Sequence, residues 1–108
     1  MTGVRTREYF ETVNPEGDTI RVRFATDHGE LLWYTVQFEV YVEGRYYPAV
    51  RYAAAHDYPH RDVLDWSGHV VDKMWLAPLP LRAAFNDALA TAKRDWPQLR
   101  AEFFRRKP

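Results

Sequence analysis

The sequence predicts an α+β domain of two layers, in which an antiparallel β-meander of about five strands has one face covered by a C-terminal amphipathic helix. Two observations support this fold class. The first three quarters of the chain alternate apolar and polar residues with the period of a half-buried strand. From Leu81 onward, the apolar residues instead recur with the period of an α-helix. Because the 108 residues contain no repeat and no linker, we expect one domain over residues 1–108.

Five segments are predicted as strands, in the order of the chain. Residues 4–13 are rich in Thr, Tyr, Phe and Val, although they alternate poorly. Residues 20–25 alternate cleanly, and residues 34–42 give the longest alternation in the chain. Residues 46–52 and 70–76 complete the set, so the strands fill most of the chain before the helix.

The segments between these strands are short and rich in turn residues, which favours a meander. Residues 14–17 place Pro and Gly where a type I turn prefers them, and residues 27–30 form a second short turn. Residues 43–44 predict a tight hairpin, and residues 67–68 predict the tip of another. Pro48 has no N–H to donate, so we expect an irregularity or an edge position there.

The helix is predicted from one apolar stripe and its flanking prolines. The stripe consists of Leu81, Ala84, Phe85, Ala88, Leu89, Ala92 and Trp96. Pro78 and Pro80 stand at its start, where a missing N–H costs nothing. Pro97 disfavours a helical conformation for the residue before it, so we expect the helix to stop there. A second short helix would then cover residues 97–105.

Composition and charge narrow the class of protein. The chain is 46% apolar and 16% aromatic, which indicates a folded domain rather than a disordered one. It has no cysteine and no apolar stretch long enough for a membrane helix, so we expect a cytoplasmic protein without disulfides and without membrane attachment. Fifteen basic and fifteen acidic residues cancel, which argues against coating nucleic acid by bulk charge. The basic C-terminal tail fits either a solvated helix end or an RNA contact.

Residues 51–62, RYAAAHDYPHRD, are the most informative segment, since they combine two histidines, two arginines, two aspartates and two tyrosines. We expect them to form the end of one strand and the turn after it, where binding and catalytic groups commonly lie. His56 and His60 are candidates for a proton-transfer pair. The candidates for holding a phosphate or a base, or for orienting an imidazole, are Arg51, Tyr52, Asp57, Tyr58, Arg61, Asp62 and Lys73.

Such a set suffices for metal-independent cleavage of RNA, because the ribose 2′-hydroxyl is an internal nucleophile and no cofactor is needed. A metal site on His56 and His60 is an alternative, but Pro59 argues against the helical spacing it would require. A purely structural loop is another, with Asp62 capping a turn. Lys73 reaches this segment only if its strand pairs nearby. We expect Trp33, Trp66 and Trp75 to lie in or beside the core rather than to form a stacking platform.

The run Arg51-Tyr52, Ala55-His56 and Pro59-His60-Arg61-Asp62, followed by a Lys73-bearing strand and an amphipathic helix, resembles a family of small uncharacterised prokaryotic proteins. The pattern of that family is R-Y-D-x-A-H-x-x-P-H-R-D; this chain has Ala53 where the pattern has Asp, and Asp57 at a position where Gly is common in the family. The motif is also similar to the TumE-like toxins of toxin–antitoxin systems. That resemblance implies a functional turn with His56, His60 and Arg61, an RNA target and a cognate partner protein.

Two functions therefore stay open from the sequence. In one, the protein is an RNA-directed enzyme or RNA-binding protein, in which His56, His60 and Arg61 carry the chemistry. In the other, it is a non-enzymatic interaction module, whose partner would be another protein or a second copy of this chain. The aromatic surface for such a module would be Tyr41 with residues 45–48.

Overall fold

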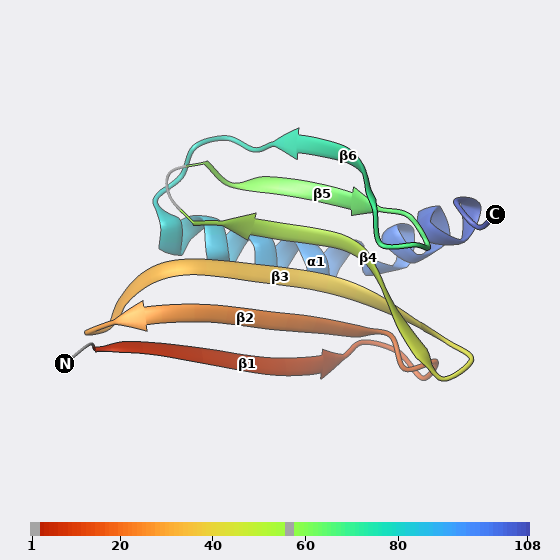
Figure 1. Ribbon diagram of the computed structural model, residues 1–108, viewed down its shortest axis with the longest axis horizontal. Coiled ribbons are helices and arrows are strands. Elements are labelled where there is room, and N and C mark those ends of the chain that lie inside the picture. The colour runs from red at the N-terminus through yellow and green to blue at the C-terminus, as the bar shows by residue number, and fades with distance from the viewer. Residues whose placement is uncertain (1–2, 56–57) are drawn as a thin grey trace.

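The computed structural model describes residues 3–55 and 58–108, and it confirms the α+β class (Figure 1). A single sheet contains the strands β1 (Val4–Thr12), β2 (Thr19–Asp27), β3 (Glu30–Val42), β4 (Arg45–Ala54), β5 (His60–Leu64) and β6 (Val70–Trp75). The chain then forms one helix, α1 (Leu81–Arg105). The strands lie in the sheet in their order along the chain, and each pairs antiparallel with the next, so the predicted meander is confirmed.

The hairpin between β3 and β4 has the backbone that its sequence predicts. Glu43 and Gly44 have φ angles of 51° and 81°, both in the left-handed region. Two successive residues of this kind make the tight turn whose twist matches that of the flanking strands. The strands therefore pair directly from Val42 and Arg45 onward.

The irregularity expected at Pro48 is present. The register between β3 and β4 shifts there, because Phe38 pairs with Val50 whereas Glu39 pairs with Pro48. On its other side, β4 pairs with β5 only from Val50 to Ala53, so Pro48 has no neighbour there that needs an N–H. A bulge at the unpaired end of a strand is a position that accepts proline.

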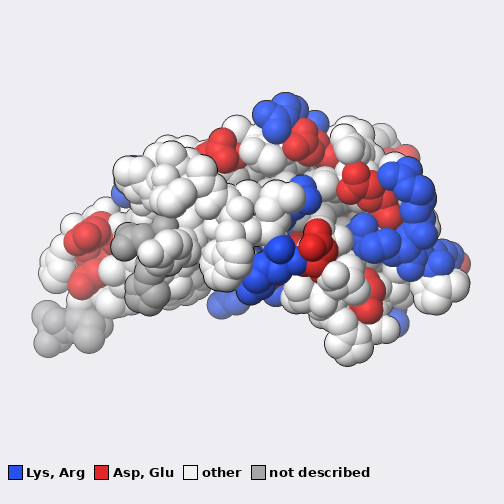
Figure 2. Space-filling model, turned by 90° about the horizontal axis from the view of Figure 1, so that it is seen from above, with Lys and Arg blue, Asp and Glu red and all other residues white. Residues whose placement is uncertain are grey.

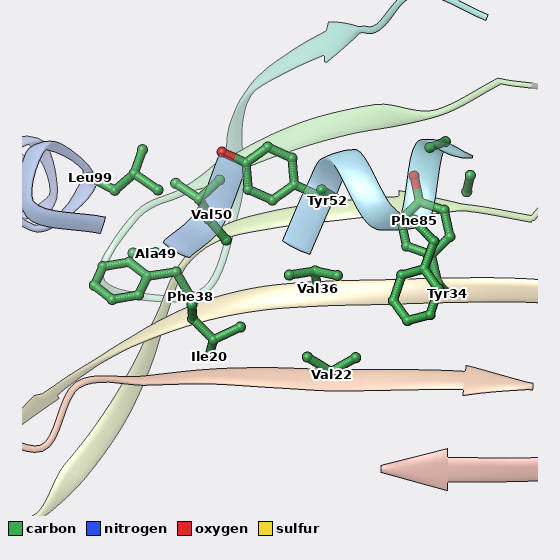
Figure 3. Packing of buried hydrophobic residues seen from close by; sticks show 14 of the residues in the cluster. Ile20, Val22, Tyr34, Val36, Phe38, Ala49, Val50, Tyr52, Phe85 and Leu99 are labelled. Carbon is green, nitrogen blue, oxygen red and sulfur yellow. The ribbon is translucent and has the colours of Figure 1, made fainter. Parts of the chain in front are cut away.

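The core lies between the sheet and α1 (Figure 3). Ile20, Val22, Val36, Phe38 and Val50 supply the buried face of the central strands. The side chains that α1 buries against them are Ala84, Phe85, Ala88, Ala92, Leu99 and Phe103. The helix packs mainly on β3 and β4. The centre of one face of the sheet is therefore buried against α1, as the alternation predicts.

The sheet has six strands rather than the five predicted, because β5 lies inside the segment expected to be a turn. Its sequence, HRDVL, has three polar residues in five and gives no clear apolar alternation. The strand forms because β4 and β6 satisfy its backbone on both sides. Pairing with its neighbours, rather than its own apolar pattern, specifies this element.

The prediction of a second short helix is wrong, because α1 continues through Pro97 without a break. The residues on either side explain this outcome. Leu99 and Phe103 are buried beside Ala92 and continue the same apolar stripe. Burying these two side chains outweighs the one hydrogen bond that a proline inside a helix removes.

The helix leaves the rest of the sheet uncovered. In Figure 1, α1 lies behind the central strands, so the view is onto the opposite face of the sheet, which we call the open face. The edge strands β1 and β6 are exposed along their whole length. Trp75 of β6 is 64% exposed, which corrects the expectation that it lies beside the core, whereas Trp66 stacks on Phe103. No helix in the described part of the chain is long and apolar enough to cross a membrane.

Candidate functional site

The strand register brings four of the predicted site residues together on the open face. Arg51 of β4 pairs with Asp62 of β5, and Asp62 pairs with Lys73 of β6. Cross-strand partners in an antiparallel sheet project from the same face, with their Cβ atoms about 5 Å apart. His60 lies two residues from Asp62 along β5 and projects from the same face. The strand that carries Lys73 therefore pairs next to this segment, and Lys73 lies beside Asp62.

The same face is hollowed next to Arg51. The hollow has a volume of about 410 Å³ and is lined by Arg21, Arg23, Thr35, Gln37 and Arg51. Thr35 and Gln37 come from β3, and the arginines come from β2 and β4. Three guanidinium groups around short or neutral side chains make a concave, polar surface that suits an anion.

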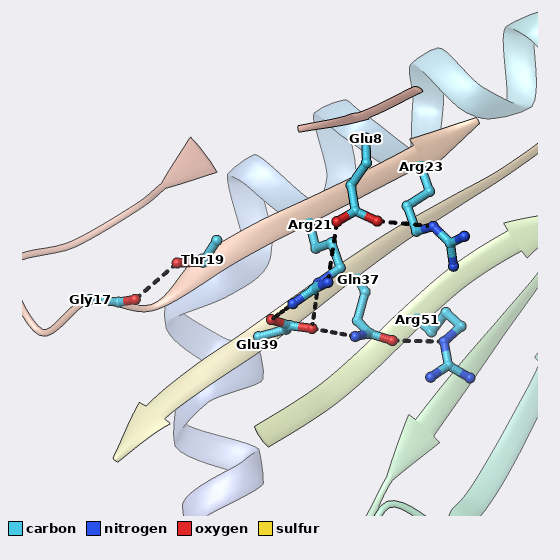
Figure 4. A network of polar contacts seen from close by, with 8 residues as sticks. All are labelled: Glu8, Gly17, Thr19, Arg21, Arg23, Gln37, Glu39 and Arg51. Carbon is cyan, nitrogen blue, oxygen red and sulfur yellow. Dashed lines mark hydrogen bonds and ion pairs between the residues drawn. The ribbon is translucent and has the colours of Figure 1, made fainter. Parts of the chain in front are cut away.

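Carboxylates hold two of these arginines in place (Figure 4). Arg21 Nε lies 3.0 Å from Glu39 Oε2, and Arg23 Nε lies 3.0 Å from Glu8 Oε2. Glu39 is buried and also accepts a hydrogen bond from Gln37. These pairs fix the geometry of the hollow, and they neutralise most of the charge that Arg21 and Arg23 bring.

Arg51 differs from its neighbours. Its Nε donates to Gln37 Oε1 at 2.8 Å, and through Gln37 it joins the same network as Glu39 (Figure 4). Among residues 3–55 and 58–108, no carboxylate forms an ion pair with it. Its guanidinium is thus oriented by a neutral amide rather than by a described carboxylate. A charged planar fork held in this way is suited to bind a phosphate.

His60, Asp62 and Lys73 form a compact group beside Arg51, which we call the His60 cluster. Asp62 is buried, and its Oδ2 lies 3.5 Å from His60 Nε2 while its Oδ1 lies 3.7 Å from Lys73 Nζ. No hydrogen bond to Asp62 Oδ1 forms within the described residues. The carboxylate therefore lies close to an imidazole and to an ammonium group, and its Oδ1 can still accept a hydrogen bond. A carboxylate that orients an imidazole is a common arrangement for proton transfer.

Small residues leave room between the hollow and the His60 cluster. His60 pairs with Ala53 of β4, and Ala53 pairs with Thr35 of β3. Because Arg51 pairs with Asp62, His60 is a diagonal neighbour of Arg51, at a spacing of about 7 to 8 Å for such positions. A phosphate bound by the Arg51 fork would therefore lie within reach of the His60 imidazole.

Tyr52 and Arg61 lie on the opposite face of the sheet, toward α1. They are cross-strand partners, and Tyr52 is buried in the core cluster. Burial raises the pKa of the Tyr52 phenol, and the neighbouring Arg61 guanidinium partly opposes that shift. The structure thus separates Arg61 from His60, although the two are adjacent in the sequence, because successive residues of a strand point to opposite faces.

The remaining candidates do not join the His60 cluster among the described residues. Tyr58 is 67% exposed in the connection before β5. His56 and Asp57 lie outside the described residues. Residues 3–55 and 58–108 contain no group of three His, Asp or Glu side chains arranged to hold a metal ion.

Sequence reasoning missed Arg21, Arg23 and Gln37. The alternation does place both arginines on the polar face of β2, opposite its apolar face, and Gln37 on the polar face of β3. Their convergence on Arg51 depends on the register of three strands, which alternation alone leaves unspecified.

A second group of basic residues lies where α1 ends, as the sequence predicts. Figure 2 shows Lys and Arg side chains gathered at that end of the molecule, with acidic groups beside them. Part of this charge is engaged internally. Arg100 Nε lies 2.9 Å from the buried Asp18, and Arg106 donates to the backbone carbonyls of Leu64 and Ala49. This end of the molecule is therefore partly a structural feature of the fold.

Residues 4–108 match the family described as a domain of unknown function (DUF7718), and the chain belongs to that family. No curated protein and no solved structure matches the chain at a significant level.

Proposed function

We propose that this member of the DUF7718 family binds RNA on the open face of its sheet and cleaves it in a metal-independent reaction, with His60 as a proton-transferring group. One observation carries the proposal. The Arg51 guanidinium, with which no described carboxylate forms an ion pair, lies on the same face as a histidine whose Nε2 is 3.5 Å from a buried aspartate. A cation for the phosphate and a base for the 2′-hydroxyl are two of the three requirements of this chemistry, and the third is an acid for the departing oxygen.

The reaction uses the 2′-hydroxyl of the RNA itself. His60 would accept the proton of that hydroxyl as the oxygen attacks the adjacent phosphorus. A bond between O2′ and phosphorus forms, the bond from phosphorus to O5′ breaks, and the departing oxygen takes a proton from an acid or from water. Arg51 and Lys73 would stabilise the charge that develops on the phosphoryl oxygens. The sequence offers His56 as the acid, and that residue lies outside the described part of the chain.

The test is cleavage of a 5′-labelled RNA in the presence of EDTA by the wild type and by His60→Ala. We expect EDTA-resistant cleavage that leaves a 2′,3′-cyclic phosphate, and a loss of roughly 10²- to 10⁴-fold in His60→Ala, the usual worth of a general acid or base. The matched control is His69→Ala, because His69 is an exposed histidine near the tip of the next turn. DNA of the same sequence should be resistant, since it lacks the 2′-hydroxyl.

Undiminished cleavage by His60→Ala would refute the catalytic role, and cleavage abolished by EDTA would point to a metal-dependent reaction. Arg51→Gln separates binding from chemistry. If Arg51 holds the phosphate, this variant should lose RNA affinity while its fold, measured by circular dichroism, is unchanged.

An interaction module is the second candidate, and the exposed sheet edges favour it. All nine residues of β1 and all six of β6 are exposed, so each edge presents unpaired backbone groups to solvent. The tyrosine surface expected from the sequence is smaller than predicted, because Tyr47 packs on Trp66 and only Tyr46, ring to ring with Tyr41, is strongly exposed. Sedimentation velocity over a wide concentration range tests self-association; a monomer at every concentration would exclude a stable homodimer.

A further inference from the structure

We propose that the RNA held on the open face is single-stranded, and that the indole of Trp75 stacks on the base next to the phosphate bound by Arg51 and Lys73. This inference rests on the proposed RNA function and specifies its substrate class. It follows from the aromatic side chains of the open face, which the proton-transfer chemistry does not use.

Aromatic rings and cations are interleaved across the open face. Arg21 lies 4.7 Å from the ring centre of Phe10, Arg23 lies 5.9 Å from that of Trp33, and Lys73 lies 5.4 Å from that of Trp75. Phe10 comes from β1, Trp33 from β3 and Trp75 from β6, so the rings are spread over the full width of the sheet. Alternating rings and cations are the usual composition of surfaces that bind single strands, because rings stack on bases while cations follow the phosphates.

Trp75 is the ring best placed for this role. It is 64% exposed on an edge strand, where no described residue covers most of its surface. It pairs with His60, and the two rings meet in a T-shaped, edge-to-face arrangement with centres 5.5 Å apart. A base stacked on the indole would therefore lie beside the histidine that handles the proton, with its phosphate directed toward Lys73 and Arg51.

The charge balance of the face indicates why stacking is needed. Glu8, Glu39 and Asp62 oppose Arg21, Arg23 and Lys73, which leaves Arg51 as the cation without a described carboxylate partner. Phosphate contacts alone would hold RNA weakly on such a surface. Stacking supplies affinity that does not depend on charge, and it requires a base whose face is free. Bases in a duplex present no free face, so the surface should select unpaired RNA.

The experiment measures the Kd of a labelled 12-nucleotide RNA by fluorescence anisotropy, as a single strand and as a duplex with its complement. The RNA is 2′-O-methylated, so that it has no nucleophile and stays intact. We expect the single strand to bind at least tenfold more tightly than the duplex. Trp75→Ala should weaken binding of the single strand by about 5- to 150-fold, the usual range for one stacked base.

Two further variants keep the result interpretable. Trp75→Phe retains a ring and should keep most of the affinity, whereas Tyr46→Ala removes an exposed aromatic residue far from the His60 cluster and should change Kd less than twofold. Because Trp75 is exposed on an edge strand, its removal should leave the thermal unfolding temperature nearly unchanged.

The outcomes separate this inference from the proposed function. Equal binding of single strand and duplex, or an unchanged Kd in Trp75→Ala while Arg51→Gln loses affinity, overturns the inference and leaves the RNA function standing. No binding of either RNA by the wild type overturns both. A change of sedimentation in Trp75→Ala with an unchanged Kd would assign the indole to a protein interface, which also overturns the inference.

Discussion

At the scale of single residues, the fully buried Asp18 connects three parts of the fold. Its Oδ2 lies 2.9 Å from Arg100 Nε and accepts a hydrogen bond from Asn14, while its Oδ1 accepts one from the backbone N–H of Tyr41. One carboxylate therefore joins the β1–β2 turn, β3 and the C-terminal half of α1.

We expect Asp18→Ala to lower the free energy of unfolding by about 3 to 5 kcal/mol, because it leaves Arg100 without its partner and an N–H group without an acceptor. Asp18→Asn keeps acceptor oxygens and should cost less. Urea denaturation followed by circular dichroism measures both. Asp72→Asn, which changes an exposed carboxylate of β6, is the control and should stay within about 0.5 kcal/mol of the wild type.

A second residue-scale prediction concerns alkaline pH and Tyr34, whose ring stacks on Phe85 at a centroid distance of 5.0 Å. Burial, with a contribution from the nearby Asp87, raises the pKa of the Tyr34 phenol to about 12. The unfolded chain releases this proton near pH 10, whereas the folded chain holds it until about pH 12. The stability that depends on the neutral phenol is therefore complete below pH 10 and is lost as the pH rises to 12.

The predicted loss over this interval is about 3 kcal/mol, since one pKa unit corresponds to about 1.4 kcal/mol. Urea denaturation between pH 9 and 11.5 should show a shallower fall in Tyr34→Phe than in the wild type. Tyr46→Phe removes an exposed hydroxyl and controls for the loss of one phenol. Parallel curves for the wild type and Tyr34→Phe would contradict the prediction.

At the scale of elements, apolar periodicity predicts those parts that bury their own side chains. It predicts β2, β3 and α1, because Val22, Val36 and Ala88 repeat with the period of their element and face one core. It fails for β5, where two flanking strands supply the stabilisation and only Asp62 and Leu64 are buried. The candidate site is affected in the same way. His60 and Asp62 can be identified from sequence as candidates, but their position beside Arg51 follows from a register that no local pattern specifies.

Pro97 gives a prediction at the same scale, because it stands inside α1 without an N–H to donate to the preceding turn. We expect Pro97→Ala to raise the free energy of unfolding by about 1 to 3 kcal/mol. The restored hydrogen bond favours the folded state, and the greater freedom of the unfolded chain offsets part of the gain. Thermal unfolding measures the change, with the exposed neighbour Gln98→Ala as control. A decrease in stability would mean that the geometry imposed by Pro97 is needed to seat Leu99 and Phe103.

At the scale of the whole molecule, the position of the helix determines which face of the sheet is left uncovered. Because α1 packs on β3 and β4 from one side, no described helix covers the other face of the sheet. The chain has a formal net charge of zero, so long-range attraction of RNA is weak and binding should depend on a few local contacts. That expectation distinguishes the open face from the basic end of α1, which the sequence offered as a second RNA contact.

Salt dependence tells these two surfaces apart. Each phosphate contact to a single strand contributes about 0.7 to the slope of log Kd against log salt concentration. If the Arg51 guanidinium holds one phosphate, Arg51→Gln should therefore reduce this slope by about 0.7, measured for the binding of a 2′-O-methylated 12-nucleotide RNA. Arg105→Gln removes an exposed charge from the last turn of α1 and should leave the slope unchanged. The reverse result, a lower slope for Arg105→Gln and an unchanged slope for Arg51→Gln, would place the RNA along the end of the helix, away from His60. Because both variants remove one charge from a neutral molecule, any difference between them reports the location of the RNA rather than the total charge.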